Sequence, residues 1–294
     1  MPGLHGTVGL GPIGTGNGPS FIEKMADLKL IEKKIISISI NYHNATSQNQ
    51  SLSYVTFGQV DPDEYQGNMY NHASVKNGEM NSWWTVSLDD LKYNGKSIFT
   101  SAVNYAIFDS GTSFIYLPKT DWDAFNSSIS QVEGLNCSTH VKHGVDQYCK
   151  SKTKTCEQLK DDLGSLKFKL QSVTYTIPPK GFLLDNILGA KCVVGVSYIS
   201  DSNNMVILGD TFMRNFYVSL EYENYRIGLA INKNAPWSNI EINLKFGFWY
   251  IFAIICLILL LIGLLACIIY CCLLERRKKR KERRMYKLQG GQSA

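Results

Sequence analysis

The first twenty residues lack the features that a secretory signal peptide requires. The stretch MPGLHGTVGLGPIGTGNGPS has no basic amino-terminal region and no continuous apolar segment. The chain also lacks internal repeats and long low-complexity segments, and only 8 of its 294 residues are proline. The lack of repeats excludes a repeat array. A disordered chain is excluded because apolar and charged fractions of 45% and 19% are those of a globular protein.

Net positive charge is confined to the carboxyl terminus. Residues 275–294 hold nine Lys and Arg residues against Glu275 and Glu282, so this tail carries a net charge of +7. Because the whole chain carries +5, residues 1–274 carry a net −2. A slightly acidic body does not fit nucleic-acid binding, and we expect no nucleic-acid partner.

An uncharged run of 29 residues, 246–274, directly precedes this basic tail. About 20 apolar residues suffice to cross a bilayer as a helix. Trp249 and Tyr250 near its start are typical of an interfacial aromatic belt, and a Lys/Arg cluster after a span marks the cytoplasmic side. The pattern predicts a single-pass, type I membrane protein with residues 1–245 lumenal or extracellular, in a lysosome-like endomembrane or at the cell surface. That orientation normally requires a signal peptide, so either further sequence lies upstream of Met1 or the run acts as a late signal and the topology is inverted. The basic flank argues against inversion, and we expect further sequence upstream.

The eight cysteines divide equally between the body and the apolar run. An even number in the body suits two disulfides on the oxidising side of a membrane, and the four are Cys137, Cys149, Cys156 and Cys192. The other four lie in the run, where Cys271 and Cys272 are either apolar filler or palmitoylation sites. Four glycosylation acceptors add modest support for a lumenal body: Asn44, Asn49, Asn126 and Asn136.

The body has the pattern of an antiparallel all-β domain. Short runs rich in β-branched and aromatic residues are separated by turn signals, and they cover 35–40, 53–58, 83–88, 167–177, 205–209 and 216–222. Only residues 19–31 and 119–132 have a helical pattern. Residues 133–160, with three cysteines, have the composition of a disulfide-stapled surface insertion.

Three familiar kinds of site fit the sequence poorly. Cys137, His140, His143 and Cys149 have the residue types of a zinc site, but in an oxidising compartment the two cysteines more often pair with each other. The glycines of 9–14 follow no full strand and include a proline, which argues against dinucleotide binding. Ser110 has no matching histidine motif for acyl transfer. We therefore expect no metal and no organic cofactor.

Asp109 is an ionisable residue inside an otherwise apolar stretch, YAIFDSGTSFIYLP. A charge there is costly unless hydrogen bonds hold it or function requires it. The hydroxyls of Ser110, Thr112 and Ser113 and the amide of Gly111 can all donate to a carboxylate in a tight turn. Two such carboxylates that face each other can share a proton and activate a water.

The motif FDSGTS resembles the second active-site motif of pepsin-like (A1 family) aspartic proteases. Four further segments resemble this family in the family's order: 6–12 with 19–25, 55–67, 83–96 and 206–230. The resemblance implies an all-β fold with residues 1–34 as a remnant of the first lobe and 35–236 as the second lobe. A linker (237–245), a transmembrane helix (246–274) and a basic cytoplasmic tail (275–294) follow.

The resemblance also assigns roles. It implies that Asp109 is a catalytic aspartate, that Ser110 braces the turn across the lobe interface, and that Thr112 bonds the outer carboxylate oxygen. It implies a Cys156–Cys192 disulfide, with Cys137–Cys149 as the expected companion. The implied activity is peptide-bond hydrolysis by water held between two aspartates, with an extended polypeptide as substrate.

No other aspartate in the chain has the flanks of the first-lobe motif; Asp201 and Asp210 do not match it. We therefore expect the first lobe, with its catalytic aspartate, upstream of Met1, and we expect this chain to be inactive alone. Two alternatives stay open. In the first, the chain is a non-catalytic, membrane-anchored binding or adhesion module derived from the protease fold. In the second, the chain forms a homodimer in which each copy supplies one Asp109.

Overall fold

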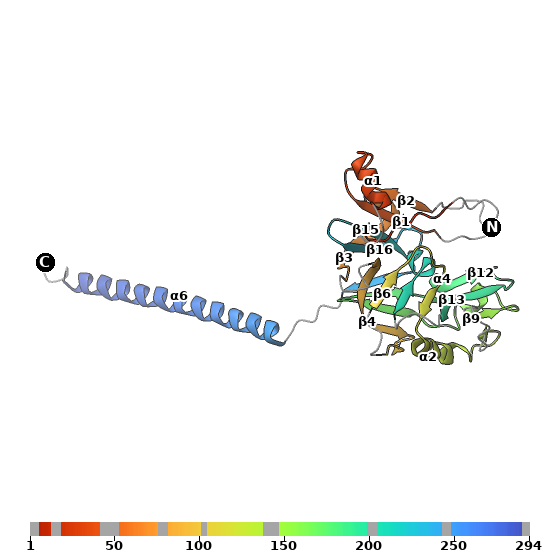
Figure 1. The fold of residues 1–294 in the computed structure, drawn as a ribbon. Coiled ribbons are helices and arrows are strands. Elements are labelled where there is room, and N and C mark those ends of the chain that lie inside the picture. The colour runs from red at the N-terminus through yellow and green to blue at the C-terminus, as the bar shows by residue number, and fades with distance from the viewer. Residues whose placement is uncertain are drawn as a thin grey trace. The chain divides into compact units, whose positions relative to one another are not determined.

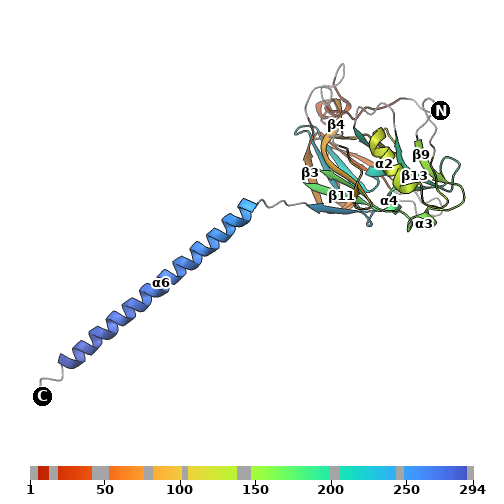
Figure 2. The same ribbon diagram turned by 90° about the horizontal axis from the view of Figure 1, so that it is seen from below.

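The computed structural model describes residues 6–12, 19–41, 53–75, 82–100, 105–137, 147–198, 205–242 and 248–289. It forms two compact units, Met1–Asn243 and Leu244–Ala294. The first is mostly β-sheet with short helices, and the second is dominated by one long helix (Figures 1 and 2).

The strands of the first unit are β1 (Ile35–Ser39), β2 (Tyr54–Phe57), β3 (Tyr65–Ala73), β4 (Trp84–Tyr93), β5 (Lys96–Ser97), β6 (Tyr105–Phe108), β7 (Ile115–Leu117), β8 (Asn136–Cys137), β9 (Gln147–Ser151), β10 (Leu166–Leu170), β11 (Val173–Ile177), β12 (Leu183–Asp185), β13 (Cys192–Tyr198), β14 (Val206–Leu208), β15 (Phe216–Glu221), β16 (Arg226–Asn232) and β17 (Asn239–Ile242). The helices are α1 (Phe21–Asp27), a 3-10 turn η1 (Pro62–Glu64), α2 (Lys119–Ile129), α3 (Cys156–Leu159), α4 (Pro179–Phe182), α5 (Asp210–Met213) and, in the second unit, α6 (Phe248–Gln289).

The smaller sheet joins the two ends of the body. Its strand order is β2-β1-β15-β16-β3. Strands β1 and β3, from early in the chain, therefore pair with β15 and β16, from the end of the body (Figure 1). Ile36 and Ile38 of β1 lie opposite Leu220 and Val218 of β15, and all four are buried. Burial of this apolar face fixes the register, because a slip of one residue would turn the isoleucines to the other face.

The larger sheet carries the candidate site. Its main order is β17-β11-β10-β4-β6-β14-β7-β13-β9-β8, with β12 beside β13 and β5 beside β4. Phe212 of α5 is fully buried and packs against Phe108, Phe168 and Phe216 at ring-centroid distances of 5.7, 5.4 and 4.9 Å. This aromatic cluster holds α5 against the end of β6, where Phe108 directly precedes Asp109.

The first unit confirms the all-β prediction and corrects some details. Two strand pairs are parallel, β6 with β14 and β7 with β13, where we expected an antiparallel sheet throughout. The run 167–177 is a hairpin, β10 and β11, that turns at Gln171 with a φ of 54°. Residues 239–242, expected in a linker, form β17 and pair with β11.

The expected surface insertion at 133–160 is also partly wrong. β9 pairs with β13, and Cys149 and Ser151 of this strand are fully buried, so part of the segment belongs to the sheet. The structure forms both expected disulfides, Cys137–Cys149 and Cys156–Cys192. The Cys137–Cys149 pairing removes both cysteine ligands of the zinc alternative, whose histidines, His140 and His143, lie outside the described residues.

Helix α6 is longer than the expected span. It runs without a break from Phe248 to Gln289, so it continues through most of the basic tail (Figure 2). The candidate span, Phe252–Lys281, is long enough to cross a membrane, and an 18-residue window within it has a mean hydropathy of 3.4 and no burial inside the protein.

Candidate active site

Asp109 lies at the end of β6, where three strands meet. β14 runs between β6 and β7, parallel to the first and antiparallel to the second. The backbone N–H of Asp109 donates to the carbonyl of Leu208 at the end of β14 (3.2 Å). The turn that carries the carboxylate is thus held by a strand from a distant part of the sequence.

Two donors hold the carboxylate of Asp109. The backbone N–H of Gly111 donates to Oδ1 at 2.9 Å, and the hydroxyl of Thr112 donates to Oδ2 at 2.5 Å. The turn closes through the N–H of Thr112, which donates to the Asp109 carbonyl at 3.2 Å. Each carboxylate oxygen of the half-buried Asp109 therefore has a donor within its own turn, which fixes the orientation of the side chain.

Gly209 allows β14 to approach this turn. A Cβ at this position would lie 2.2 Å from the carbonyl oxygen of Thr112 and 2.5 Å from that of Phe114. Directly after Gly209, the N–H groups of Asp210 and Thr211 donate to the carbonyls of Thr112 (2.7 Å) and Ser113 (3.0 Å). Only glycine fits between these backbones, so residue 209 determines how the two segments pack around Asp109.

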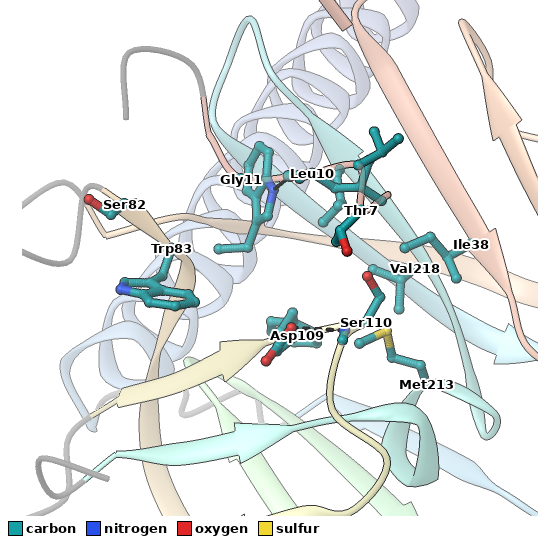
Figure 3. Close-up of a pocket in the computed structure, with 16 residues that line it drawn as sticks. Thr7, Leu10, Gly11, Ile38, Ser82, Trp83, Asp109, Ser110, Met213 and Val218 are labelled. Atoms are coloured by element: carbon teal, nitrogen blue, oxygen red, sulfur yellow. Dashed lines mark hydrogen bonds between the residues drawn. The ribbon is translucent and has the colours of Figure 1, made fainter. Parts of the chain in front are cut away.

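Asp109 opens onto a cavity of about 360 Å³. Figure 3 shows Asp109 between Trp83 and Ser110, with Thr7, Ile38, Met213 and Val218 on the other walls. The mixture of one charged group with apolar and aromatic walls is typical of a site that binds an organic ligand.

The amino-terminal segment forms part of the cavity wall. The carbonyl of Leu10 accepts hydrogen bonds from the indole N–H of Trp84 (2.6 Å) and the hydroxyl of Tyr222 (2.8 Å). The rings of Trp84 and Tyr222 meet edge to face, 4.9 Å apart. Residues 6–12 are therefore tied to the strands that surround Asp109.

Asp210 is a second carboxylate close to the first. Burial raises its pKa from 3.8 to about 6; Arg214 opposes this shift and Asp109 adds to it. Its Oδ1 atom is buried without a hydrogen-bond partner among the described residues. Asp210 is not one of the cavity-lining residues.

Sequence reasoning identified part of this arrangement. The structure brings Asp109, Gly111 and Thr112 together as expected, and it places Ser110 at the exposed rim of the cavity. The bracing role of Ser110 stays a prediction. Trp83 and residues 7–11 were not recognised as cavity walls, since no local pattern in the sequence marks them.

The proximity of Asp210 was also missed, although a signal existed. An ionisable residue directly follows an apolar run at 205–209, which is the same pattern that singled out Asp109. No group of three or more possible metal ligands occurs within the described residues.

Comparison with known proteins gives a consistent result. A family model described as eukaryotic aspartyl protease matches residues 3–232. Pepsin A of Bos taurus is 27% identical over 217 residues, which cover 74% of this chain and 52% of that protein. A protein of Arthroderma benhamiae described as a probable aspartic-type endopeptidase is 26% identical over 247 residues, 80% of this chain and 42% of its own length.

The fold agrees with these sequence relatives. The crystal structure of an aspartic proteinase from Irpex lacteus superposes with a TM-score of 0.64 at 19% identity, over 80% of this chain and 70% of that chain. The chain spans about half the length of the curated relatives that it matches. Since the family model covers most of the body, the chain belongs to the eukaryotic aspartyl protease family.

Proposed function

We propose that this chain provides the Asp109 half of an aspartic endopeptidase. The observation that carries the proposal is the carboxylate of Asp109, held by Gly111 and Thr112 at the edge of a 360 Å³ cavity. Family membership gives peptide bonds as the bonds to be cleaved.

Asp109 requires a second carboxylate for this chemistry. Of two carboxylates that share one proton, the charged one acts as base and takes a proton from the attacking water. The protonated one donates to the scissile carbonyl oxygen, on which negative charge develops. The donors from Gly111 and Thr112 hold the Asp109 carboxylate in a fixed orientation through both steps.

We propose that the second aspartate belongs to a first lobe outside residues 1–294. Two points support this: Asp109 is the only aspartate of the chain with the active-site flanks, and the matched relatives are about twice as long as the matched part. Residues 1–294 alone should then hydrolyse no peptide bond.

The test compares this chain with a form extended at its amino terminus by the first lobe. Both are incubated with an unfolded protein substrate between about pH 3 and pH 7, and new amino termini are counted. We expect cleavage by the extended form only. Cleavage by residues 1–294 alone would contradict the need for a first lobe and would favour the homodimer. An extended form that does not cleave the substrate would favour a binding or adhesion module.

We also propose that α6 anchors the protein in a membrane as a type I, single-pass protein. Its uncharged part, residues 248–274, is 27 residues and about 40 Å long at 1.5 Å per residue, more than the roughly 30 Å of a bilayer core. The absence of burial argues against a soluble core helix. Protease treatment of sealed microsomes should remove residues 275–294 and spare the body; the opposite pattern would refute this orientation.

The remaining site proposals concern glycosylation. Asn136 is exposed on β8, so it is the acceptor that we favour. Asn126 is half-buried on α2, with its Oδ1 3.5 Å from Cys149 Sγ, and is a poorer acceptor. Asn44 and Asn49 lie outside the described residues. Loss of a glycosidase-sensitive mass shift in Asn136→Gln would test the first assignment.

A further inference from the structure

The carboxyl-terminal half of the apolar run contains three cysteines within six residues. Cys267, Cys271 and Cys272 are all exposed on α6, whereas Cys256 near the other end of the run is half-exposed. All four cysteines of the body are paired in the two disulfides, so the free thiols of the described residues are confined to this helix.

The four thiols lie at different depths relative to the basic tail, which begins at Arg276. At 1.5 Å per residue, Cys271 and Cys272 lie about 6–8 Å from this residue along the axis, Cys267 about 13 Å, and Cys256 about 30 Å. If Arg276 lies at the headgroup level, Cys271 and Cys272 are just inside the leaflet next to the tail. Cys267 is then near the bilayer midplane, and Cys256 is near the opposite surface. Tilt shortens all these depths by the same factor, so the order holds.

We propose that Cys271 and Cys272 carry long-chain fatty acyl thioesters. The proposal rests on the membrane anchoring proposed above, with the tail on the cytoplasmic side. At this depth a thiol meets a donor at the membrane surface, and an acyl chain on it extends directly into the hydrocarbon. Cys267 and Cys256 meet neither condition at the cytoplasmic surface.

The donor would be a long-chain acyl-coenzyme A. The cysteine Sγ attacks the carbonyl carbon of the donor thioester and forms a new C–S bond. The C–S bond to coenzyme A breaks, and the coenzyme A thiolate takes up the proton that the cysteine thiol released. Oxidation states do not change. The nine Lys and Arg residues after Glu275 favour this step, because they attract the phosphate groups of the donor to the same surface.

The acyl chains would fix the position of α6 in the membrane. The uncharged part of α6, residues 248–274, exceeds the usual core thickness by about 10 Å, so the helix has more than one depth and tilt at which it can lie. Each chain buries further methylene groups at about 0.8 kcal/mol per CH₂ in the leaflet next to the tail. This favours positions that keep Cys271 and Cys272 inside that leaflet.

The test uses the full chain in eukaryotic cells and acyl exchange. Disulfides in the membrane fraction are first reduced, and all free thiols are blocked. Thioesters are then cleaved with neutral hydroxylamine, and each released thiol is labelled with a polyethylene-glycol maleimide. We expect a mass shift of two tags for the wild-type chain, one for Cys271→Ala or Cys272→Ala, and none for the double variant. The matched control, Cys256→Ala with Cys267→Ala, should keep both tags.

Three outcomes would overturn the proposal. Tags that persist in the Cys271→Ala, Cys272→Ala double variant would place the acyl groups elsewhere. A wild-type chain without tags that resists alkaline carbonate extraction would overturn acylation and leave membrane anchoring intact. A chain that alkaline carbonate extracts would overturn both.

Discussion

Replacement of Asp210 by asparagine should stabilise the protein at neutral pH. The side chain follows Gly209 directly at the start of α5, and its buried Oδ1 has no hydrogen-bond partner among the described residues. Burial raises the pKa of this carboxyl to about 6, against 3.8 for an ordinary aspartate, despite the opposing charge of Arg214. The negative form is therefore disfavoured in the folded protein.

The sign and size of the effect follow from this pKa shift. Because the pKa of Asp210 is higher in the folded protein than in the unfolded one, its protonated form adds to the free energy of unfolding. This contribution is fully present below pH 3.8 and is lost as the pH rises through about 6. Two units correspond to about 3 kcal/mol at 1.36 kcal/mol per unit. Because Asp210 is only half-buried, solvent screening reduces this, and we expect a gain of about 1–2 kcal/mol for Asp210→Asn above pH 7.

Chemical unfolding of the full chain in detergent measures this gain. Tryptophan fluorescence at about pH 4 and pH 7.5 should give nearly equal free energies of unfolding for both proteins at the lower pH, and a more stable variant at the higher pH. Asp123→Asn is the matched control, because this exposed carboxylate pairs with Lys119 at 2.5 Å and should contribute less than about 1 kcal/mol. An Asp210→Asn variant that is less stable at pH 7.5 would mean that Arg214 outweighs burial, and the reasoning would be wrong.

Three further predictions concern packing and buried charge. Gly209→Ala should lower the melting temperature and abolish activity of the extended form, because its Cβ would meet the Thr112 carbonyl at 2.2 Å; unchanged melting would contradict the packing argument. His72 is buried, with Nε2 2.6 Å from the Tyr175 hydroxyl, and burial lowers its pKa. Stability should therefore fall as the pH drops below 6.5, and His72→Gln should flatten this slope in the same unfolding assay. Burial raises the pKa of Asp121, so Asp121→Asn should raise the melting temperature at pH 7.5 and leave it nearly unchanged near pH 4; an equal effect at both values would refute this.

The sequence predicts local elements well where burial and periodicity agree. Strands β1, β14 and β15 lie within the expected runs because their apolar residues alternate or cluster over lengths typical of strands. Helix α2 begins at Lys119 as expected, with Trp122 and Phe125 buried on one face.

Long-range arrangement was harder to predict. Nothing local to β14 indicates that it runs between β6 and β7. This pairing creates one of the two parallel strand pairs, β6 with β14, and it supports Asp109. The hairpin of β10 and β11 was read as one run, because its turn at Gln171 lacks glycine and proline. The residues around the Asp109 carboxylate were predictable since Gly111 and Thr112 belong to the same turn. Trp83 and Leu10 reach the cavity only through tertiary packing.

The central claim is that the Asp109 carboxylate takes part in peptide hydrolysis, and its direct test is the turnover number of Asp109→Asn in the form extended by the first lobe. Asparagine keeps the shape of the side chain and removes the base. Since general acid–base catalysis contributes about 10²–10⁴-fold per group, we predict a loss of at least about 10²-fold in kcat, with Asp123→Asn as the control that keeps full activity. Cleavage of an unfolded protein by Asp109→Asn at the rate of the unchanged enzyme would contradict the account.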